Sequence, residues 1–541
     1  MYECPNCGGN LRFDIPSQQL ACRFCDTHIS PYAIKKETDA VEQEYYEATV
    51  FTCPQCAGEI YTTDNEAASF CSFCGAATIL SSRIAKEKRP KYIIPFKITK
   101  ENCKEAYAKK MKKAFFAPKQ LRDPKYIDGF RGIYMPYWTY QLTQKGKVTF
   151  AGKKSHREGD YIITDHFDLK GDLDAYYLGY SRDASSGFYD NISEPLAPFD
   201  AKQLVNFEPT FLSGFYADTG DIDASVYLDD VTELANNSTF DKVCKEPAFS
   251  GYDVNSSVNS ISLPARIPTT CKEADNTMYP VWFLTYRNKD RVAYATVNGQ
   301  TGKVVADMPI DTGKYLLFSL LLALPIFLFL NLFLTVIPKT LLGLACLLVL
   351  ISALIYKREL KAIRIKENNE DDEGVQIKKK ALKQANKLRQ KVYGMETVKK
   401  KVSNKKNTGN KSSGDVGKLL TKVIIWIVMI CWAMPFFVNF GTGFIWPVVI
   451  IIDFVVCGLG IAEAQKTGGT APVGFIVSIV MVALAGLVLL FNPVSDLWYY
   501  GGAFLTLLAV LFNIMDVIRN YNRLAMRRLP QFERRGGDLY A

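Results

Sequence analysis

The sequence predicts a multidomain protein with two small cysteine-rich ribbons, a β-rich α+β soluble domain and an α-helical membrane region of about six transmembrane helices. Eight of the fourteen cysteines form four Cys-x-x-Cys pairs near the N-terminus, β-type patterns dominate from about 90 to 310, and long apolar runs follow residue 314. Charge divides the chain in the same way. From 314 onward, 29 Lys and Arg stand against 14 Asp and Glu, a net charge of +15, so the total of +10 leaves about −5 for residues 1–313.

The N-terminal cysteines form two copies of one unit. In each unit fourteen residues separate the two pairs, which are Cys4 and Cys7 with Cys22 and Cys25, and then Cys53 and Cys56 with Cys71 and Cys74. The copies share proline after the first cysteine, glycine after the first pair (Gly8 and Gly58), and phenylalanine before the last cysteine (Phe24 and Phe73). Such detailed repetition indicates a duplicated metal-binding module.

Four cysteines at this spacing are typical of a tetrahedral zinc site, with sulfur about 2.3 Å from the metal. A unit of roughly 25 residues buries too little apolar surface to fold alone, so metal binding supplies folding free energy. Because thiolates fill every position, we predict two structural Zn²⁺ ions and no activation of water. Redox dithiols or an iron–sulfur cluster are the alternatives. His28 could replace a ligand, but four thiolates make it a bystander.

These assignments divide the N-terminal region into ribbon 1 at 1–35, an acidic linker at 36–50 and ribbon 2 at 51–82. Metal-binding thiols must be reduced, which favours the cytoplasm for this region. No signal peptide opens the chain, because Met1 leads directly into a metal motif. The six remaining cysteines share no short spacing and are interpreted as ordinary thiols: Cys103, Cys244, Cys271, Cys346, Cys431 and Cys457.

A β-rich cytoplasmic domain is predicted over 90–310. Residues 92–96 have the pattern of a short strand, and 100–116 have helical spacing. Two later passages, 135–140 and 279–286, each place Pro-x-Trp before an aromatic strand, which suggests a weak internal repeat. The second passage continues as 292–305, a predicted hairpin whose turn contains Gly299 and Gly302.

Nothing in this domain predicts catalysis, and we expect no enzyme activity. His156 and His166 have no nucleophile motif near them in the sequence. An acidic cluster lacks the glycine-centred loop and final glutamate of a calcium-binding EF-hand, and we interpret it as a solvated acidic face. Its members are Asp221, Asp223, Asp229 and Asp230.

Six apolar runs predict the membrane region. They cover Tyr315–Val336, Thr340–Tyr356, Leu419–Val438, Phe444–Ile461, Pro472–Phe491 and Leu497–Val517. The corresponding segments are a transmembrane hairpin at 314–356, a basic cytoplasmic linker at 357–418, a four-helix transmembrane segment at 419–518 and a basic cytoplasmic tail at 519–541. Cations gather in the linker and the tail, so the positive-inside rule places both termini in the cytoplasm.

Two features of this region leave alternatives open. The linker stretch from Ile377 to Met395 has a helical apolar stripe among lysines, which suits a helix on anionic lipid, although a flexible basic linker explains it equally well. Asp453 lies in the middle of a span, where an ionisable residue is a candidate for function. Since Asn331 is its only obvious polar companion, we favour structural pairing between helices over transport.

The motifs resemble a known family. They are the two cysteine units together with Tyr92-Ile93-Ile94-Pro95-Phe96-Lys97, Phe116-Ala117-Pro118-Lys119, Gly132-Ile133-Tyr134-Met135-Pro136-Tyr137-Trp138 and Val297-Asn298-Gly299-Gln300-Thr301-Gly302-Lys303-Val304. Over about residues 1–356 the chain resembles membrane-bound tandem zinc-ribbon proteins of Gram-positive bacteria. Members are often labelled primosomal helicase-like, phage replication or TFIIB-type zinc ribbon proteins, and the resemblance implies a link to SPFH-domain membrane scaffolds and envelope stress. A helicase role is unsupported because the chain has no phosphate-binding Gly-x-x-x-x-Gly-Lys-Ser/Thr loop.

These observations favour a membrane-anchored zinc-binding adaptor or scaffold whose cytoplasmic ribbons dock a partner, either an SPFH-domain protein or another zinc-ribbon protein, while lipid surrounds the helices. Nucleic-acid binding is the alternative, because ribbons commonly bind DNA or RNA. The net charge of about −5 over 1–313 opposes it, since phosphate affinity comes from Lys and Arg. A transporter component built on the six spans is the third hypothesis.

Overall fold

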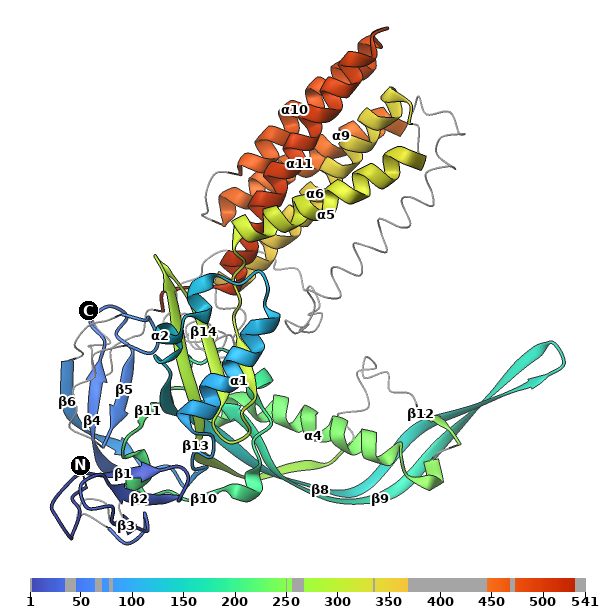
Figure 1. Cartoon of the computed structure of the whole chain (residues 1–541). Helices are drawn as coiled ribbons and strands as arrows, with labels where there is room; N and C mark the ends of the chain where they lie inside the picture. The colour runs from blue at the N-terminus through green and yellow to red at the C-terminus, as the bar shows by residue number, and fades with distance from the viewer. Residues whose placement is uncertain are drawn as a thin grey trace, which may run out of the picture.

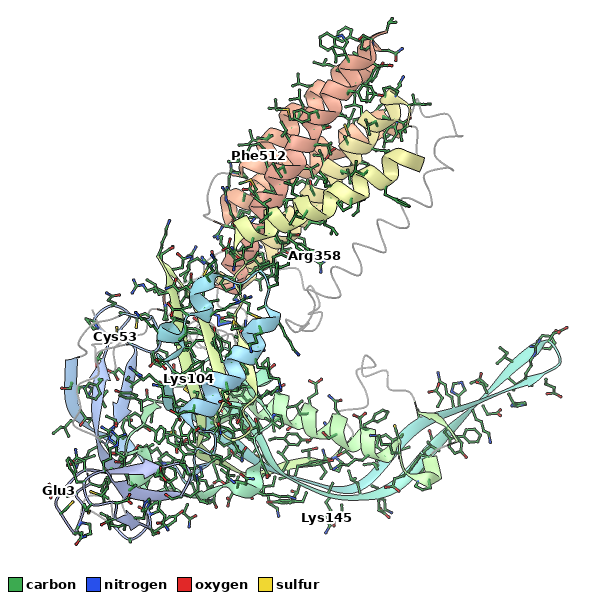
Figure 2. All side chains as sticks on the ribbon, in the orientation of Figure 1. Glu3, Cys53, Lys104, Lys145, Arg358 and Phe512 are labelled. Atoms are coloured by element: carbon green, nitrogen blue, oxygen red, sulfur yellow. The ribbon has the colours of Figure 1, made fainter. Side chains whose placement is uncertain are left out.

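The computed structural model describes residues 2–34, 45–63, 71–76, 81–249, 251–254, 267–333, 336–367, 445–467 and 472–530. Figure 1 shows three parts: a β-rich head that contains both cysteine units, a long two-stranded arm that leaves the head, and a bundle of helices on the opposite side of the head from the first cysteine unit. Side chains fill the head and the bundle, whereas the outer half of the arm stands in solvent (Figure 2). The predicted combination of cysteine clusters, β-rich domain and apolar helices is therefore present.

The first cysteine unit forms a small sheet of its own. Strands β1 (Leu11–Asp14), β2 (Gln19–Cys22) and β3 (His28–Ile29) pair antiparallel and form no ladder with the main sheet among the described residues. One face of this sheet rests on the head: the Phe13 ring lies 5.3 Å from the Phe211 ring, and the Ser213 hydroxyl donates to the Leu11 carbonyl at 2.6 Å. Because the sheet supplies the contact, the cysteine turns are left at the periphery.

The remaining strands form one 13-stranded sheet, with the main path β10-β7-β13-β8-β11-β5-β4-β6. The second cysteine unit belongs to this sheet through β4, β5 and β6, and β5 pairs directly with β11. The strands are β4 (Tyr45–Thr52), β5 (Glu59–Thr62), β6 (Ser81–Lys88), β7 (Tyr92–Ile93), β8 (Arg131–Glu158), β9 (Tyr161–Asp183), β10 (Val205–Asn206), β11 (Tyr216–Asp218), β12 (Asp253–Val254), β13 (Thr269–Asn288), β14 (Arg291–Asn298), β15 (Val304–Ala306) and β16 (Arg527–Arg528).

The two Pro-x-Trp passages lie side by side at the centre of this sheet. They occupy β8 and β13, which pair antiparallel with Met135 opposite Tyr279. Each strand then continues into a hairpin with its neighbour, β8 with β9 and β13 with β14. The hairpin predicted over 292–305 is also confirmed: β14 pairs with β15, and Gly302 has a φ of +75°, a conformation that glycine adopts without strain. The two passages thus lie on the middle pair of four neighbouring strands, β9, β8, β13 and β14.

Helices and 3₁₀ turns cover parts of the sheet. They are α1 (Lys100–Lys113), η2 (Lys119–Arg122), α2 (Pro124–Ile127), α3 (Asp190–Leu196), η3 (Ala201–Gln203), η4 (Pro209–Leu212), η5 (Ala224–Tyr227), α4 (Leu228–Val243) and η6 (Pro247–Phe249). The predicted helix 100–116 is present as α1, capped by the Thr99 side chain, but it ends at Lys113. Phe115 lies two residues past this end and packs against Phe318 of the membrane region, with ring centroids 5.8 Å apart.

The arm is the outer part of the β8–β9 hairpin. The two strands stay paired in register to Glu158 and Tyr161 at the tip, well past the last pairing of β8 with β13 at Gln144. Helix α4 packs on the base of the arm, whereas the tip exposes Tyr161 and Ile162 by 77% and 76%. Nothing in the sequence predicted a hairpin of this length.

The membrane region contains α5 (Thr312–Phe333), α6 (Pro338–Glu367), α9 (Ile445–Lys466), α10 (Val473–Phe491) and α11 (Asp496–Ala525). Four of them, α6, α9, α10 and α11, are long and apolar enough to cross a membrane, and α5 adds a shorter apolar stretch, Thr312–Ile326. The described residues therefore support four full spans rather than the six predicted. The predicted span Leu419–Val438 lies outside the described residues, as does the linker from 368 onward.

Two of the helices continue beyond their predicted ends. Helix α6 runs on from Tyr356 to Glu367, because Leu360 and Ile363 remain buried and keep its apolar stripe in contact with the bundle. Helix α11 likewise continues to Ala525, so the first turns of the predicted tail are helical. The chain then pairs with the head, where β16 adds antiparallel to β14.

Glu367 joins the bundle to the head. Its carboxylate, 8% exposed, accepts hydrogen bonds from Arg291 of β14 at 2.9 Å, from Arg523 of α11 at 3.0 Å and from Arg528 of β16 at 2.8 Å. The Arg291 guanidinium also donates to the carbonyl of Met526 at 2.9 Å. One carboxylate therefore forms ion pairs with cations from the sheet, the last membrane helix and the returning strand.

We expect Glu367→Gln to lower the free energy of unfolding by about 3 kcal/mol, because it leaves the nearly buried Arg291 without a counter-charge. Thermal unfolding of the purified protein in detergent measures the change. The matched control is Glu463→Gln, which breaks the 2.8 Å pair with Arg364; since Arg364 is 43% exposed, this variant should cost less than about 1 kcal/mol. Equal losses in the two variants would contradict the central role of Glu367.

Candidate metal centres

The four Cys-x-x-Cys turns share one backbone geometry. We call each turn, with the two residues that follow it, a knuckle. In every knuckle the fifth residue, which follows the second cysteine, donates its N–H to the carbonyl of the first cysteine over 2.8 to 3.0 Å. The first cysteine in turn donates its N–H to the carbonyl of the sixth residue over 2.7 to 3.0 Å. The four knuckles are 4–9, 22–27, 53–58 and 71–76. The tight loop directs both sulfurs of a pair to the same side.

A left-handed residue closes each knuckle. Gly8, Asp26, Ala57 and Gly75 have φ values of +72°, +54°, +57° and +68°. The structural partner of Gly8 is therefore Ala57, and the sequence pairing of Gly8 with Gly58 was wrong by one position. The sequence signal was weak because only two of the four residues are glycine, the residue that adopts this conformation most readily.

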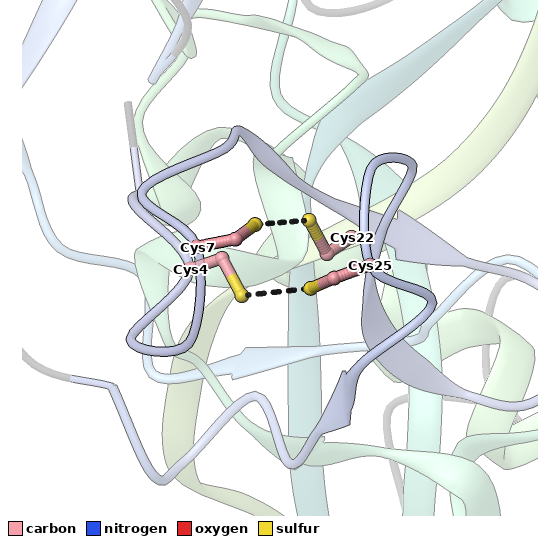
Figure 3. A group of neighbouring side chains, drawn as sticks. All are labelled: Cys4, Cys7, Cys22 and Cys25. Atoms are coloured by element: carbon pink, nitrogen blue, oxygen red, sulfur yellow. Dashed lines mark hydrogen bonds between the residues drawn. The ribbon is translucent and has the colours of Figure 1, made fainter.

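The sulfur positions fit a four-thiolate metal site. In the first cluster the Sγ atoms of Cys4 and Cys25 are 3.6 Å apart and those of Cys7 and Cys22 are 3.4 Å apart, as the dashed lines in Figure 3 mark. In the second cluster both corresponding distances are 3.7 Å. Tetrahedral zinc with bonds of about 2.3 Å requires sulfurs about 3.8 Å apart, far more than the ~2 Å of a disulfide. Both clusters therefore suit a metal ion.

In each cluster, hydrogen bonds to and between the sulfurs shift the pKa values of the thiols. The Thr27 hydroxyl lowers the pKa of Cys25 to about 6 by hydrogen bonding to its sulfur. In the second cluster a hydrogen bond with Cys71 lowers the pKa of Cys53 to about 6, and the same contact raises the pKa of Cys71. Bound zinc would hold all four groups as thiolates, because metal binding displaces the remaining protons. With four protein ligands such an ion is structural.

The two sites differ in exposure. All four cysteines of the second site are buried, between Phe51, Ile60 and Phe73. In the first site Cys7 is exposed and Cys25 is partly exposed. The difference follows from the fold, because the second ribbon is part of the main sheet and the first rests on its edge.

Other candidates from the sequence do not form metal groups among the described residues. His28 lies on β3 outside the four-sulfur cluster, as expected of a bystander. His156 and His166 lie on the arm, where His156 faces Asp165 at 3.7 Å. In the acidic cluster Asp221, Asp223 and Asp229 are exposed, and Asp230 pairs with Arg182. Of the other cysteines, Cys103, Cys346 and Cys457 are buried, Cys244 and Cys271 are partly exposed, and Cys431 lies outside the described residues.

Asp453 is buried in the bundle, and its carboxylate has no hydrogen-bond partner among the described residues. The helix-to-helix pairing lies elsewhere: the Asn513 amide of α11 donates to the hydroxyls of Ser352 in α6 and Ser478 in α10, both at 2.9 Å. This cluster was missed because single Asn and Ser residues in apolar runs carry no signal until the helices are packed.

The fold and sites thus define a protein with four helices that could cross a membrane and, in a β-rich head, two four-cysteine clusters that could hold metal ions. No family model matches the chain, and no solved structure matches it. The chain is 30% identical over 317 residues to the uncharacterized protein YdjG of Bacillus subtilis (strain 168). That match covers 58% of this chain and 91% of YdjG, and the chain belongs to the same family as YdjG.

We expect Cys7→Ser and Cys56→Ser each to reduce bound zinc from two ions to about one per chain, because three thiolates hold structural zinc poorly. Only Cys56→Ser should also lower the melting temperature of the head, since its site lies within the main sheet. Elemental analysis and thermal unfolding measure both effects. Cys244→Ser is the control and should change neither. Full zinc content in Cys7→Ser would contradict the first site.

Removal of metal by a chelator should occur in two phases. The first site should release its ion faster because Cys7 is exposed, whereas every ligand of the second site is buried. Absorbance of a colorimetric zinc chelator mixed with the full-length protein gives the rates. The fast phase should be missing in Cys7→Ser; a single phase for both ions in the native protein would contradict the difference in burial.

Proposed function

We propose that this protein is a membrane-anchored zinc-binding adaptor or scaffold, in which the ribbons dock a cytoplasmic protein and the helices hold the complex at the membrane. The observation that carries this proposal is the direct connection, by strand pairing and by the Glu367 ion pairs, between the head with its cysteine clusters and the bundle. Strand β16 follows α11 directly and extends the sheet to which the second ribbon belongs. A partner bound to the head would therefore be held at a fixed position relative to the membrane.

Closed metal sites support docking over chemistry. Each proposed zinc ion has four thiolate ligands from the protein, which leaves no position for water or substrate. What such a site contributes is a fixed surface on a very small module. The resemblance to membrane-bound tandem zinc-ribbon proteins points to an SPFH-domain protein or a second zinc-ribbon protein as the partner, in a complex that responds to membrane stress.

The directions of the helices support a multi-pass topology with the head in the cytoplasm. Helix α9 runs parallel to α6, because Trp446 lies against Gly343 at the end away from the head and Glu463 pairs with Arg364 near the head. Helix α6 ends near the head and α9 begins far from it. A span in 419–438 would account for this change of side, which gives the six-span arrangement that we propose.

Charge gives the orientation. Near the head the described helix ends carry many cations, including Lys357, Arg358, Lys361, Arg364 and Arg523, whereas Lys339 is the only one of the described residues at the far ends. By the positive-inside rule, this distribution of cations supports a head, and with it both termini, in the cytoplasm.

A labelling experiment tests this orientation. We expect Ser495→Cys, in the loop between α10 and α11 far from the head, to react with a membrane-impermeant maleimide in intact cells. Ser155→Cys on the arm should react only after the membrane is permeabilised. The unmodified chain provides the background. Reaction of Ser155→Cys in intact cells would reverse the assigned topology.

The adaptor function is tested with full-length protein purified from crosslinked membranes. We expect a protein partner to co-purify and its recovery to fall at least tenfold in Cys7→Ser, because loss of the first metal unfolds an exposed ribbon without disturbing the main sheet. Cys244→Ser should recover the partner at the native level. Equal recovery from Cys7→Ser would exclude the first ribbon as the docking module, and salt-sensitive recovery of nucleic acid in place of protein would favour the alternative function.

A further inference from the structure

The duplicated ribbons present the same surface in two different situations. The surface consists of the second knuckle together with the second cysteine of the first knuckle. In the second ribbon it comprises 71–76 with Cys56, and all of these residues except Gly75 are buried. In the first ribbon it comprises 22–27 with Cys7, where Arg23, Phe24 and Cys7 are exposed. We call this surface the knuckle face.

The knuckle face of the second ribbon is covered by the β13–β14 hairpin. The Tyr294 hydroxyl donates to the Phe73 carbonyl at 2.7 Å, and the Thr285 hydroxyl donates to the Ser72 carbonyl. Arg287 adds a hydrogen bond at 2.7 Å to the side-chain oxygen of Gln55, in the first knuckle. The Phe73 side chain is only 3% exposed and packs in the same cluster as the four cysteines. Two hydroxyl groups on this strand pair thus donate to the second knuckle, and one guanidinium donates to the first knuckle of the same ribbon.

The first ribbon has the same groups without a cover. Phe24 corresponds to Phe73 and is 80% exposed, more than any other aromatic side chain in the described part of the chain. The carbonyls of Arg23 and Phe24, which correspond to those of Ser72 and Phe73, accept no hydrogen bond from the described residues. Asn6 occupies the place of Gln55 and is exposed. Every contact point used in the second ribbon is therefore present and accessible in the first.

We propose that the knuckle face of the first ribbon docks a β-strand pair of another protein, whose Ser, Thr or Tyr hydroxyls donate to the carbonyls of Arg23 and Phe24 while Phe24 becomes buried. This inference rests on the proposed adaptor function and names its docking surface. The chemistry of the occupant is taken from the intramolecular interface, where the same surface is already bound.

A second copy of this chain does not fit as the occupant. The strand pair with the matching donors, β13–β14, is covered by the second ribbon of its own chain, where Phe73 and Ser72 are each 3% exposed. Opening it would expose the buried second metal site. The occupant is therefore a different protein with a free strand pair of this kind.

Phe24 could also serve to shield the metal ligands, and a test must distinguish this role from docking. A Cβ on Gly9 would lie 2.5 Å from the Phe24 ring and 3.3 Å from the sulfurs of Cys7 and Cys22, so the ring lies beside the metal ligands. A ring that only shields the ligands would be needed for metal retention. A docking ring would be dispensable for metal and required for the partner.

The experiment places the photoreactive amino acid benzoylphenylalanine at position 24 of the full-length protein in cells. The control position is 84, since Ile84 on β6 of the second ribbon is 79% exposed and lies outside the knuckle face. We expect a covalent adduct with another protein at 24 and none at 84. Mass spectrometry should locate the crosslink on a strand that carries hydroxyl side chains, and replacing these by Val or Phe in the partner should reduce the adduct at least about tenfold.

A companion variant, Phe24→Ala, should retain two zinc ions per chain and lose partner recovery at least about tenfold, whereas Ile84→Ala should lose neither. The inference is overturned by a missing adduct at 24, by equal adducts at 24 and 84, by a crosslink to a second copy, lipid or nucleic acid, or by loss of one zinc ion in Phe24→Ala. If recovery of a partner falls in Cys7→Ser but not in Phe24→Ala, the adaptor function is supported and the knuckle face is not its docking surface. If no partner is recovered at all, the adaptor function itself fails.

Discussion

The junction at Glu367 is the constraint on which the rest of the architecture depends. A carboxylate at the end of one membrane helix is surrounded by guanidinium groups from the sheet, from the last membrane helix and from the strand that follows it. Glu367 and Arg291 are nearly buried, so each of these two charges requires the other, whereas Arg528 is largely exposed. Because β16 also pairs with β14, the sheet and the bundle are joined by backbone as well as by charge. The head is therefore connected to the membrane region both by strand pairing and by ion pairs.

This connection explains why the two ribbons have different surroundings. The second ribbon contributes β4, β5 and β6 to the main sheet, and Leu529, just after β16, packs against its cysteine cluster. A metal ion bound there would contribute to the stability of the whole head. The first ribbon forms no ladder with that sheet among the described residues and contacts the head through side chains, for example Phe13 on Phe211 and the Gln18 amide on the Phe96 carbonyl, so a metal ion bound there would stabilise a more local unit. One duplicated module has thus become part of the scaffold, and the other has kept an accessible surface.

The sequence predicted those features that short spacings encode. Two cysteines separated by two residues already define a knuckle, so the eight cysteines that gather in the two clusters could be identified without the structure. The hairpin over 292–305 followed from local turn residues, and α1 followed from the helical spacing of its apolar residues. Features that depend on partners distant in the chain could not be predicted. Arg527 and Arg528 were assigned to a basic tail, yet they form a strand, because their pairing depends on β14 more than 200 residues earlier.

The same distinction applies to the candidate docking surface. Phe24 and Phe73 occupy equivalent positions in the sequence, and their spacing to the cysteines is identical. Their exposures of 80% and 3% arise only from tertiary packing, since β13 and β14 cover one of them. Burial of an exposed aromatic ring is favourable, so a partner that covers Phe24 would gain binding free energy from this contact. The second ribbon therefore shows how a knuckle face is covered by a strand pair, and this contact serves as the template for the uncovered knuckle face of the first ribbon.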